Sequence, residues 1–299
     1  MNSSPEGAWL RAMPAVFVLI WSTGFVVAKY GLPYAPPLSF LAIRYALSLV
    51  CFLVWIALAR VQWPRGRQQW LHLAVSGVLI HAGYLGGVWM AIKAGMGSGL
   101  ASLMVGLQPI LTALWVSSRA ENHDSTEKVT QRQWLGLALG LGGLVLVVSR
   151  KFGSTLEVTV FTMAAITVAL LSITAGTLYQ KRYVKPADVR GANAIQLAAA
   201  FAVTLPLALL ETEVVVWTPQ FVGALAWSVL VLTLGGSSLL YMLIQRGAAT
   251  AVTSLMYLVP PCTALMAWLL FSEPITAVTV LGTAITALGV SLVVRAARV

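Results

Sequence analysis

The feature that most constrains this chain is a series of apolar stretches, each about 20 residues long, separated by short polar connections. A helix of that length crosses the hydrocarbon core of a bilayer. Only 9% of the 299 residues are charged and 59% are hydrophobic, which leaves too few charges to cover a water-exposed surface of this size. We therefore expect an all-α membrane protein whose outer surface faces lipid.

About ten transmembrane helices can be placed along the chain, each boundary being defined to within a few residues. Several connections, such as Pro33 to Pro37 and Gly95 to Gly99, are short, which favours antiparallel neighbours and leaves no room for a soluble domain. The predicted spans are about 12–30, 38–59, 71–93, 98–117, 133–149, 158–181, 192–210, 219–245, 250–271 and 276–295.

The net charge of +10 comes from basic residues in the gaps between spans, where orientation signals and lipid headgroup contacts belong. With the N-terminus in the cytoplasm, fourteen of the nineteen Lys and Arg residues are inside, four are outside, and Arg44 lies within the second span. Both termini are therefore predicted to be cytoplasmic, and lipid rather than nucleic acid is the expected partner of the basic loops. Cys51 and Cys262 lie in apolar stretches, which favours core residues over a disulfide or metal site.

The second half of the chain repeats the first. At an offset of 152 residues, Ala42–Arg44 matches Ala194–Gln196, and Trp89–Gly95 matches Tyr241–Gly247. The same register pairs Glu121 with Glu273, and after six extra residues it resumes at an offset of 146. We divide the chain into two five-helix repeats, residues 1–150 and 151–299.

Five is an odd number, so the two repeats must enter the membrane from opposite faces, related by a pseudo-two-fold axis in the membrane plane. Inverted repeats are typical of transporters, which place the substrate site near the midplane between the halves. Exchanging the conformations of the two repeats would generate the inward- and outward-facing states. The expected fold is thus ten helices in two inverted five-helix repeats.

This pattern resembles the drug/metabolite transporter superfamily, and within it the EamA-like bacterial permeases. The resemblance is carried by the five-plus-five repeat, by Arg44 in the second span, and by the Glu273-Pro274 turn before a glycine-rich last helix. More narrowly, the sequence is similar to the YddG-type exporters of aromatic amino acids. The resemblance implies a multi-pass permease of the bacterial inner membrane that exports small amphipathic metabolites, with aromatic or other large apolar amino acids as the leading cargo.

Candidate substrate-binding residues lie on the first, third, fourth, eighth and ninth spans. An aromatic substrate needs flat apolar walls and a few hydrogen-bonding groups for its polar ends. On the third span, Gly77, His81, Tyr84 and Val88 fall at helical spacing on one face. The candidates are His81, Tyr84, Trp89, Ser98, Ser102, Ser237, Ser238, Tyr241, Gln245, Ser254, Tyr257 and Trp21.

His81 lies close to the middle of its span, where a polar group is costly unless it faces a cavity or a partner. One interpretation is substrate contact or proton handling near neutral pH. The other is an inter-helix hydrogen bond that only fixes packing. For the aromatic candidates, the alternative to lining a cavity is facing lipid.

Arg44 and Glu273 are interpreted as structural charges. The long stem of Arg44 could snorkel to the outer interface, or its guanidinium could pair with Glu273, the nearest outside carboxylate by topology. A structural role is favoured because Gln196 holds the equivalent place in the second repeat. A substrate carboxylate as the partner of Arg44 is the alternative.

Prolines and glycines indicate how the helices bend and pack. Pro109 and the pair Pro260 and Pro261 interrupt backbone hydrogen bonding in the fourth and ninth spans, either as hinges or as static bends. Small-residue spacing predicts close packing of the fifth and tenth spans. The glycines concerned are Gly136, Gly140, Gly143, Gly282 and Gly289.

The scarcity of charged residues inside the predicted spans limits the possible mechanisms of transport. No Asp or Glu lies in the interior of a predicted span, which disfavours proton coupling through an embedded carboxylate. Facilitated diffusion, exchange, or proton coupling through His81 remain as mechanisms. Few basic residues lie inside spans, which disfavours phosphorylated cargo. An exporter of other amphipathic metabolites or drugs is the main alternative. An intramembrane enzyme is remote, because nothing aligns a nucleophile with a base. We expect no cofactor or metal, and the oligomeric state is left open.

Overall fold

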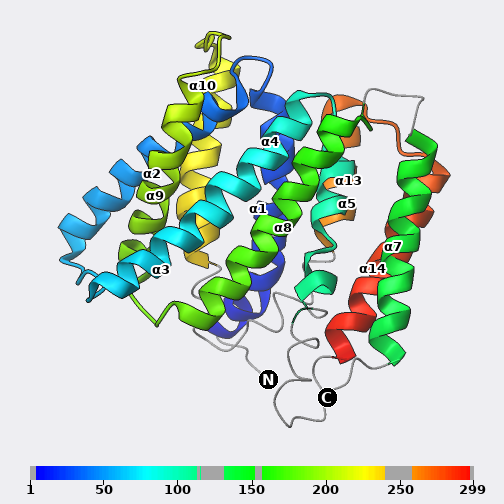
Figure 1. Ribbon diagram of the computed structural model, residues 1–299, viewed down its shortest axis with the longest axis horizontal. Helices are drawn as coiled ribbons and strands as arrows, with labels where there is room; N and C mark the ends of the chain where they lie inside the picture. The colour runs from blue at the N-terminus through cyan, green and yellow to red at the C-terminus, as the bar shows by residue number, and fades with distance from the viewer. Residues whose placement is uncertain (1–4, 113–114, 116–130, 152–156, 240–257, 297–299) are drawn as a thin grey trace.

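The computed structural model describes residues 5–112, 115, 131–151, 157–239 and 258–296, and every regular element among them is a helix (Figure 1). Two of the elements, η1 and η2, are π-helices. In chain order the elements are α1 (Pro5–Gly31), α2 (Pro37–Ala59), α3 (Arg67–Gly77), η1 (Val78–Leu85), α4 (Gly86–Lys93), α5 (Ser98–Val105), α7 (Gln131–Lys151), α8 (Val160–Tyr183), α9 (Val189–Ala208), α10 (Pro219–Ala226), η2 (Trp227–Gly236), α13 (Val259–Phe271) and α14 (Ala277–Ala296).

The prediction of an all-helical membrane protein is confirmed for the described residues. Five continuous helical segments are long and apolar enough to cross a bilayer. They are Pro37–Ala59, Arg67–Lys93, Val160–Tyr183, Val189–Ala208 and Pro219–Leu239. Five further apolar helical runs of the described chain are shorter, and they coincide with the predicted first, fourth, fifth, ninth and tenth spans.

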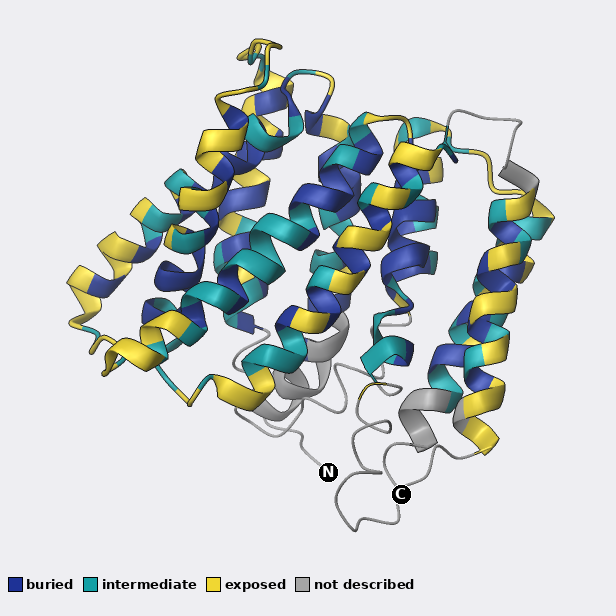
Figure 2. Cartoon of the chain, in the orientation of Figure 1, coloured by how far each residue is buried: buried dark blue, intermediate teal, exposed yellow. Residues whose placement is uncertain are grey.

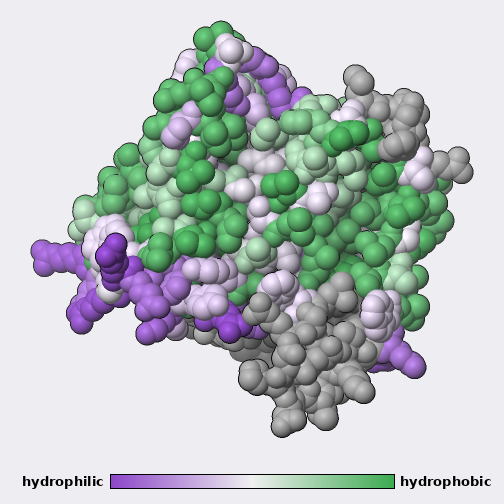
Figure 3. Space-filling view, in the orientation of Figure 1, coloured by the Kyte–Doolittle hydropathy of each residue, from purple (hydrophilic) through white to green (hydrophobic). Residues whose placement is uncertain are grey.

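The surface of the helices is largely apolar. Leu58 is 81% exposed and Val160 is 90% exposed, values that would be unfavourable for large side chains in water. Exposed residues recur along α2, α8 and α7 (Figure 2). Hydrophobic residues cover most of the visible face, while hydrophilic residues gather where α2 and α3 meet (Figure 3). This distribution is the one that a lipid environment requires.

Two helix pairs organise the structure. α2 packs along α9, and α7 packs along α14 at one edge of the molecule (Figure 1). Between these pairs, α1 contacts α13, α10 and η2, while α8 contacts η1, α3, α4 and α5. α1 and α2 both contact η2, so these segments lie close to one another.

Glycines allow the close approach of α7 and α14, as predicted. A Cβ atom at Gly289 would lie 2.5 Å from the carbonyl oxygen of Gly136, and one at Gly143 would lie 2.5 Å from Thr286 Oγ1. Thr286 Oγ1 of α14 also donates to the Gly140 carbonyl oxygen of α7 at 3.3 Å. The two backbones are thus in direct contact, which is how helices associate in lipid without a hydrophobic driving force.

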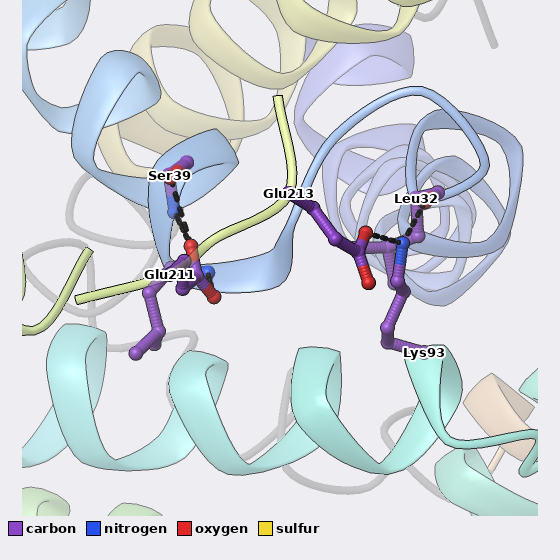
Figure 4. A network of polar contacts seen from close by, with 6 residues as sticks. Leu32, Ser39, Lys93, Glu211 and Glu213 are labelled. Carbon is purple, nitrogen blue, oxygen red and sulfur yellow. Dashed lines mark hydrogen bonds and ion pairs between the residues drawn. The ribbon is translucent and has the colours of Figure 1, made fainter. Parts of the chain in front are cut away.

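Carboxylates at one end of the bundle hold the helix termini (Figure 4). Glu211 accepts hydrogen bonds from the backbone N–H groups of Leu38 (3.0 Å) and Ser39 (2.7 Å), which are free donors in the first turn of α2. Lys93 Nζ donates to Glu213 at 2.6 Å and to the Leu32 carbonyl oxygen at 3.1 Å. Both glutamates lie outside the helices, as the sequence indicates.

Glu273, which follows α13, forms an ion pair with a residue other than Arg44. Its carboxylate accepts from Lys29 Nζ at 2.6 Å and from the Ser98 backbone N–H at 3.0 Å. Pairing of Arg44 with Glu273, one of the two structural alternatives that the sequence offers for Arg44, is therefore not formed. The reason is geometric, because Lys29 and the positive N-terminal end of α5 meet Glu273 at the helix ends, whereas Arg44 is buried within α2.

Adjacent glycines of α7 provide a matched test of this packing. Gly143→Ala places a methyl group against Gly282 and Thr286, so we expect destabilisation of about 1–3 kcal/mol and a lower melting temperature in detergent. Gly142→Ala adds its Cβ to open space and is expected to leave the melting temperature unchanged or slightly raised. Equal melting temperatures for the two variants would contradict the close α7–α14 contact.

Candidate functional site

A cavity lies among α1, α2, η1, α4 and η2. It offers about 60 Å³ of space to water-sized molecules. Its apolar wall includes Phe25, Leu85, Val88 and Leu232. The predicted site residues that line it are Trp21, Arg44, His81, Tyr84, Trp89 and Ser237. The structure thus gathers charged, polar and aromatic candidates from four separate segments into one place inside the bundle.

The third span presents one helix face to the cavity. His81, Tyr84, Leu85, Val88 and Trp89 all line the cavity, and their spacing of three and four residues is that of a single helix face. Part of this span, η1, is a π-helix, in which residue i bonds to i+5. The sequence predicts the span but not its π-helix, for which it carries no clear signal.

Gly77 was placed on the same face as His81 by α-helical spacing, and this expectation is wrong. A Cβ atom at Gly77 would lie 2.5 Å from the Gln196 Cα, so Gly77 packs against α9 rather than facing the cavity. Further along the same helical segment, Gly87 meets the backbone of α8, because a Cβ atom there would lie 2.5 Å from the Ala165 carbonyl oxygen. These contacts fix the rotation of the third span.

The backbone of η1 is held by a tyrosine of α2. The Tyr45 hydroxyl donates to the His81 carbonyl oxygen at 2.8 Å, and the two rings lie edge to face with centroids 6.0 Å apart. Tyr45 is fully buried in the hydrophobic core. The buried Tyr45 hydroxyl thereby has an acceptor away from water, and the bond joins α2 to η1.

The second π-helix occupies the matching place in the second repeat. Adding the offset of 152 residues to η1 gives residues 230–237, which overlap η2 (Trp227–Gly236). Thr233 then corresponds to His81, and it also lines the cavity. Thr233 Oγ1 donates to the Ser228 carbonyl oxygen at 2.8 Å, so one side chain satisfies a backbone oxygen of its own π-helix.

Arg44 lies within α2 with only 7% of its surface exposed. Its Nε donates to Thr233 Oγ1 at 3.1 Å across to η2. Among the described residues, the carboxylates form ion pairs with Lys29, Lys93 and Arg190, and none pairs with Arg44. Guanidinium groups remain ionised in proteins, so the cavity carries a buried positive charge.

Aromatic rings form the rest of the wall. Tyr84 and Trp89 are 4% and 1% exposed, and the Trp89 ring packs on Phe40 with centroids 4.3 Å apart. Trp21 is partly buried and packs on Phe17 at 5.2 Å. These rings face the cavity and are not on the lipid-exposed surface.

Other predicted residues lie elsewhere. Ser98 and Ser102 are buried near the start of α5 and do not line the cavity; Ser102 Oγ donates to the Gly99 carbonyl oxygen at 2.8 Å. Ser238 neighbours the lining residue Ser237, but its Oγ is buried without a hydrogen-bond partner. Tyr241, Gln245, Ser254 and Tyr257 lie outside the described residues.

The predicted prolines lie near interruptions of the helices. Pro109 follows a turn at Gly106 and Leu107 that ends α5, and a short helical run continues to Thr112. Pro260 and Pro261 lie in the first turn of α13, where the missing N–H costs no hydrogen bond. Hinge motion at these prolines stays a prediction.

A polar, aromatic cavity inside a bundle of lipid-facing helices defines the class of the protein, a membrane transporter. Comparison with known families agrees. The EamA-like transporter family matches residues 12–149 and again residues 160–295, and the chain belongs to this family.

Proteins of similar sequence are also named as transporters. An uncharacterized transporter of Archaeoglobus fulgidus is 26% identical over 93% of this chain and 94% of its own length. The uncharacterized inner membrane transporter YedA of Escherichia coli is 27% identical over 82% of this chain and 73% of its own. A probable amino-acid metabolite efflux pump of Salmonella typhimurium is 28% identical over 64% of this chain and 60% of its own.

A crystal structure shares the fold of the chain. It aligns with a TM-score of 0.68 over 97% of this chain and 99% of its own, at 16% sequence identity. Together these findings make the protein a multi-pass membrane transporter.

The bond that supports η1 can be tested directly. Tyr45→Phe removes the hydrogen bond to the His81 carbonyl oxygen, which we expect to cost about 0.5–1.5 kcal/mol. Tyr30→Phe, at a side chain that is largely exposed at the end of α1, is the control and is expected to be neutral. Thermal unfolding of the two purified variants measures the difference, and equal melting temperatures would show that the hydroxyl does not support η1.

Proposed function

We propose that the protein exports small amphipathic metabolites by alternating access, with aromatic or other large apolar amino acids as the leading cargo. The observation that carries the proposal is the cavity itself. It combines aromatic walls from Trp21, Tyr84 and Trp89 with the polar groups of Arg44 and His81. The similar protein of Salmonella typhimurium, named a probable amino-acid metabolite efflux pump, supports amino acids or their metabolites as the class of cargo.

Alternating access is supported by the way the two halves meet. The repeat register pairs α2 with α9 and α7 with α14, and in each case the paired helices are in contact. Both repeats also carry a π-helix at matching positions, and both π-helices line the cavity. Such pairing is what a pseudo-two-fold axis between inverted repeats would produce.

The size of the cavity fits a protein that must move to transport. A water molecule needs about 10–15 Å³ of such space, so the cavity holds about four waters. An aromatic amino acid is much larger, and the helices around the cavity would have to separate to admit it. Closed and open states of this kind are what alternating access requires.

Charge at the helix ends supports an orientation with both termini in the cytoplasm of a bacterial inner membrane. Exposed basic residues gather at the ends of α2 and α8 and in the connections that follow them, whereas Glu211, Glu213 and Glu273 lie at the opposite ends of the helices. The basic residues are Arg60, Arg65, Arg67, Lys181, Arg182 and Lys185. Cytoplasmic loops are typically rich in Lys and Arg.

The decisive experiment is exchange in proteoliposomes preloaded with unlabelled substrate and supplied with a panel of radiolabelled amino acids. Saturable exchange confined to aromatic and large apolar amino acids is the expected result. Trp21→Ala is expected to lower exchange about fivefold to tenfold because it removes a stacking surface. Trp134→Ala, at a tryptophan on α7 that is 57% exposed, is the matched control and is expected to retain exchange.

His81→Ala is measured alongside, and loss of exchange in a folded variant would place His81 in the substrate path. Exchange of other amphipathic compounds without amino acids would favour the alternative cargo. Absence of exchange for every compound, by protein shown to be folded, would remove the amino-acid assignment while leaving the family intact.

A further inference from the structure

We infer that Arg44 is the receptor for a carboxylate group of the transported substrate, so that the cargo is a carboxylic acid with an apolar or aromatic body. This inference rests on the proposed function and narrows its substrate class. It assigns to Arg44 a binding role in place of the structural role that the sequence favours.

Among the described residues, no carboxylate pairs with the charge of Arg44. All nine Asp and Glu residues of the chain lie outside the predicted span interiors. Those that the structure describes near the bundle ends are engaged there, Glu273 with Lys29 and Glu213 with Lys93. Removing an ionised group from water costs several kcal/mol unless it is paired, so an unpaired guanidinium inside a transporter calls for an anion.

Most of the hydrogen-bonding capacity of Arg44 is unused by the described residues. A guanidinium has five N–H donors, and among the described residues Arg44 donates through Nε alone, to Thr233 Oγ1 at 3.1 Å. Anchoring through Nε fixes the plane of the group while leaving its Nη donors available. Two parallel N–H groups match the two oxygens of a carboxylate.

The repeat-equivalent residue provides an internal comparison. Gln196 on α9 is also buried, and its Nε2 donates to Ser76 Oγ at 2.9 Å and to Gln180 Oε1 at 3.3 Å. The buried side chain at this position of the second repeat is therefore neutral, and Ser76 and Gln180 accept its hydrogen bonds. Arg44 differs from Gln196 in three ways. It is charged, it has one hydrogen-bond partner among the described residues, and it lines the cavity.

The surroundings of Arg44 specify the rest of the ligand. Trp21 and Tyr84 line the same cavity and offer aromatic surfaces to an apolar body. No described carboxylate lines the cavity, so the site offers no ion pair to a cation. Amines that lack a carboxylate are therefore expected to bind poorly, as are amides and esters of the acids that bind well.

The test compares tryptophan, indole-3-acetate, tryptophan amide and tryptamine as competitors of radiolabelled exchange in proteoliposomes. Wild-type protein is expected to favour the two carboxylates over the amide and the amine by at least about tenfold, the loss expected when a charged donor faces no acceptor. Arg44→Gln is expected to lose this preference, together with most of the exchange of the two acids.

Two further variants separate binding from folding. Arg44→Lys retains the charge but loses the paired donors, and it is expected to retain a weakened preference for the acids. Gln196→Ala changes the equivalent buried position outside the cavity, and it is expected to retain the full preference even if its melting temperature falls. A preference lost in Gln196→Ala as well as in Arg44→Gln would show a general structural effect and would overturn the assignment.

Binding is measured separately from transport, as the rise in melting temperature of detergent-purified protein with each of the four compounds. A rise with the acids alone, absent in Arg44→Gln, supports the inference even if no exchange is detected and the proposed function fails. Equal effects of acids and amide on the wild type, or no effect of either acid, would overturn the inference. Exchange that makes no distinction between acid and amide would overturn it too, while leaving the exporter function in place.

Discussion

The architecture depends on one constraint, that hydrocarbon does not solvate ionised or unpaired polar groups. Described carboxylates accordingly lie at the ends of the helices, where Glu211 caps α2 and Glu273 joins Lys29 to the start of α5. Inside the bundle, the charged side chain of Arg44 lines the cavity. We propose that a carboxylate of the substrate pairs with it there.

Two local departures from regular α-helix border the cavity beside Arg44. The π-helices η1 and η2 both line the cavity, and Tyr45 and Thr233 donate hydrogen bonds to backbone carbonyl oxygens within them. Thr233 also anchors Arg44, so one hydroxyl couples the second π-helix to the buried charge. The site is therefore assembled from both halves of the chain, which allows relative motion of the halves to change it.

Much of the fold could be predicted from the sequence because hydropathy and glycine spacing are properties of single helices. The predicted spans correspond to described helices, and the glycines of α7 and α14 pack as expected. The contacts that individual residues make between helices were harder to predict from the sequence. Glu273 meets Lys29 rather than Arg44, and Gly77 faces α9, because helix rotation and depth follow from three-dimensional packing and from π-helices that the hydropathy pattern does not reveal.

The central claim, that the cavity lies on the substrate path, is tested most directly by cysteine accessibility at two neighbouring serines. Ser237 lines the cavity and Ser238 does not. With Cys51 and Cys262 replaced by serine, Ser237→Cys is expected to react with a water-soluble thiol reagent and to be protected by transported substrate, whereas Ser238→Cys is expected to show no such protection. Equal labelling of both positions, unaffected by a substrate that the same protein exchanges, would contradict the claim.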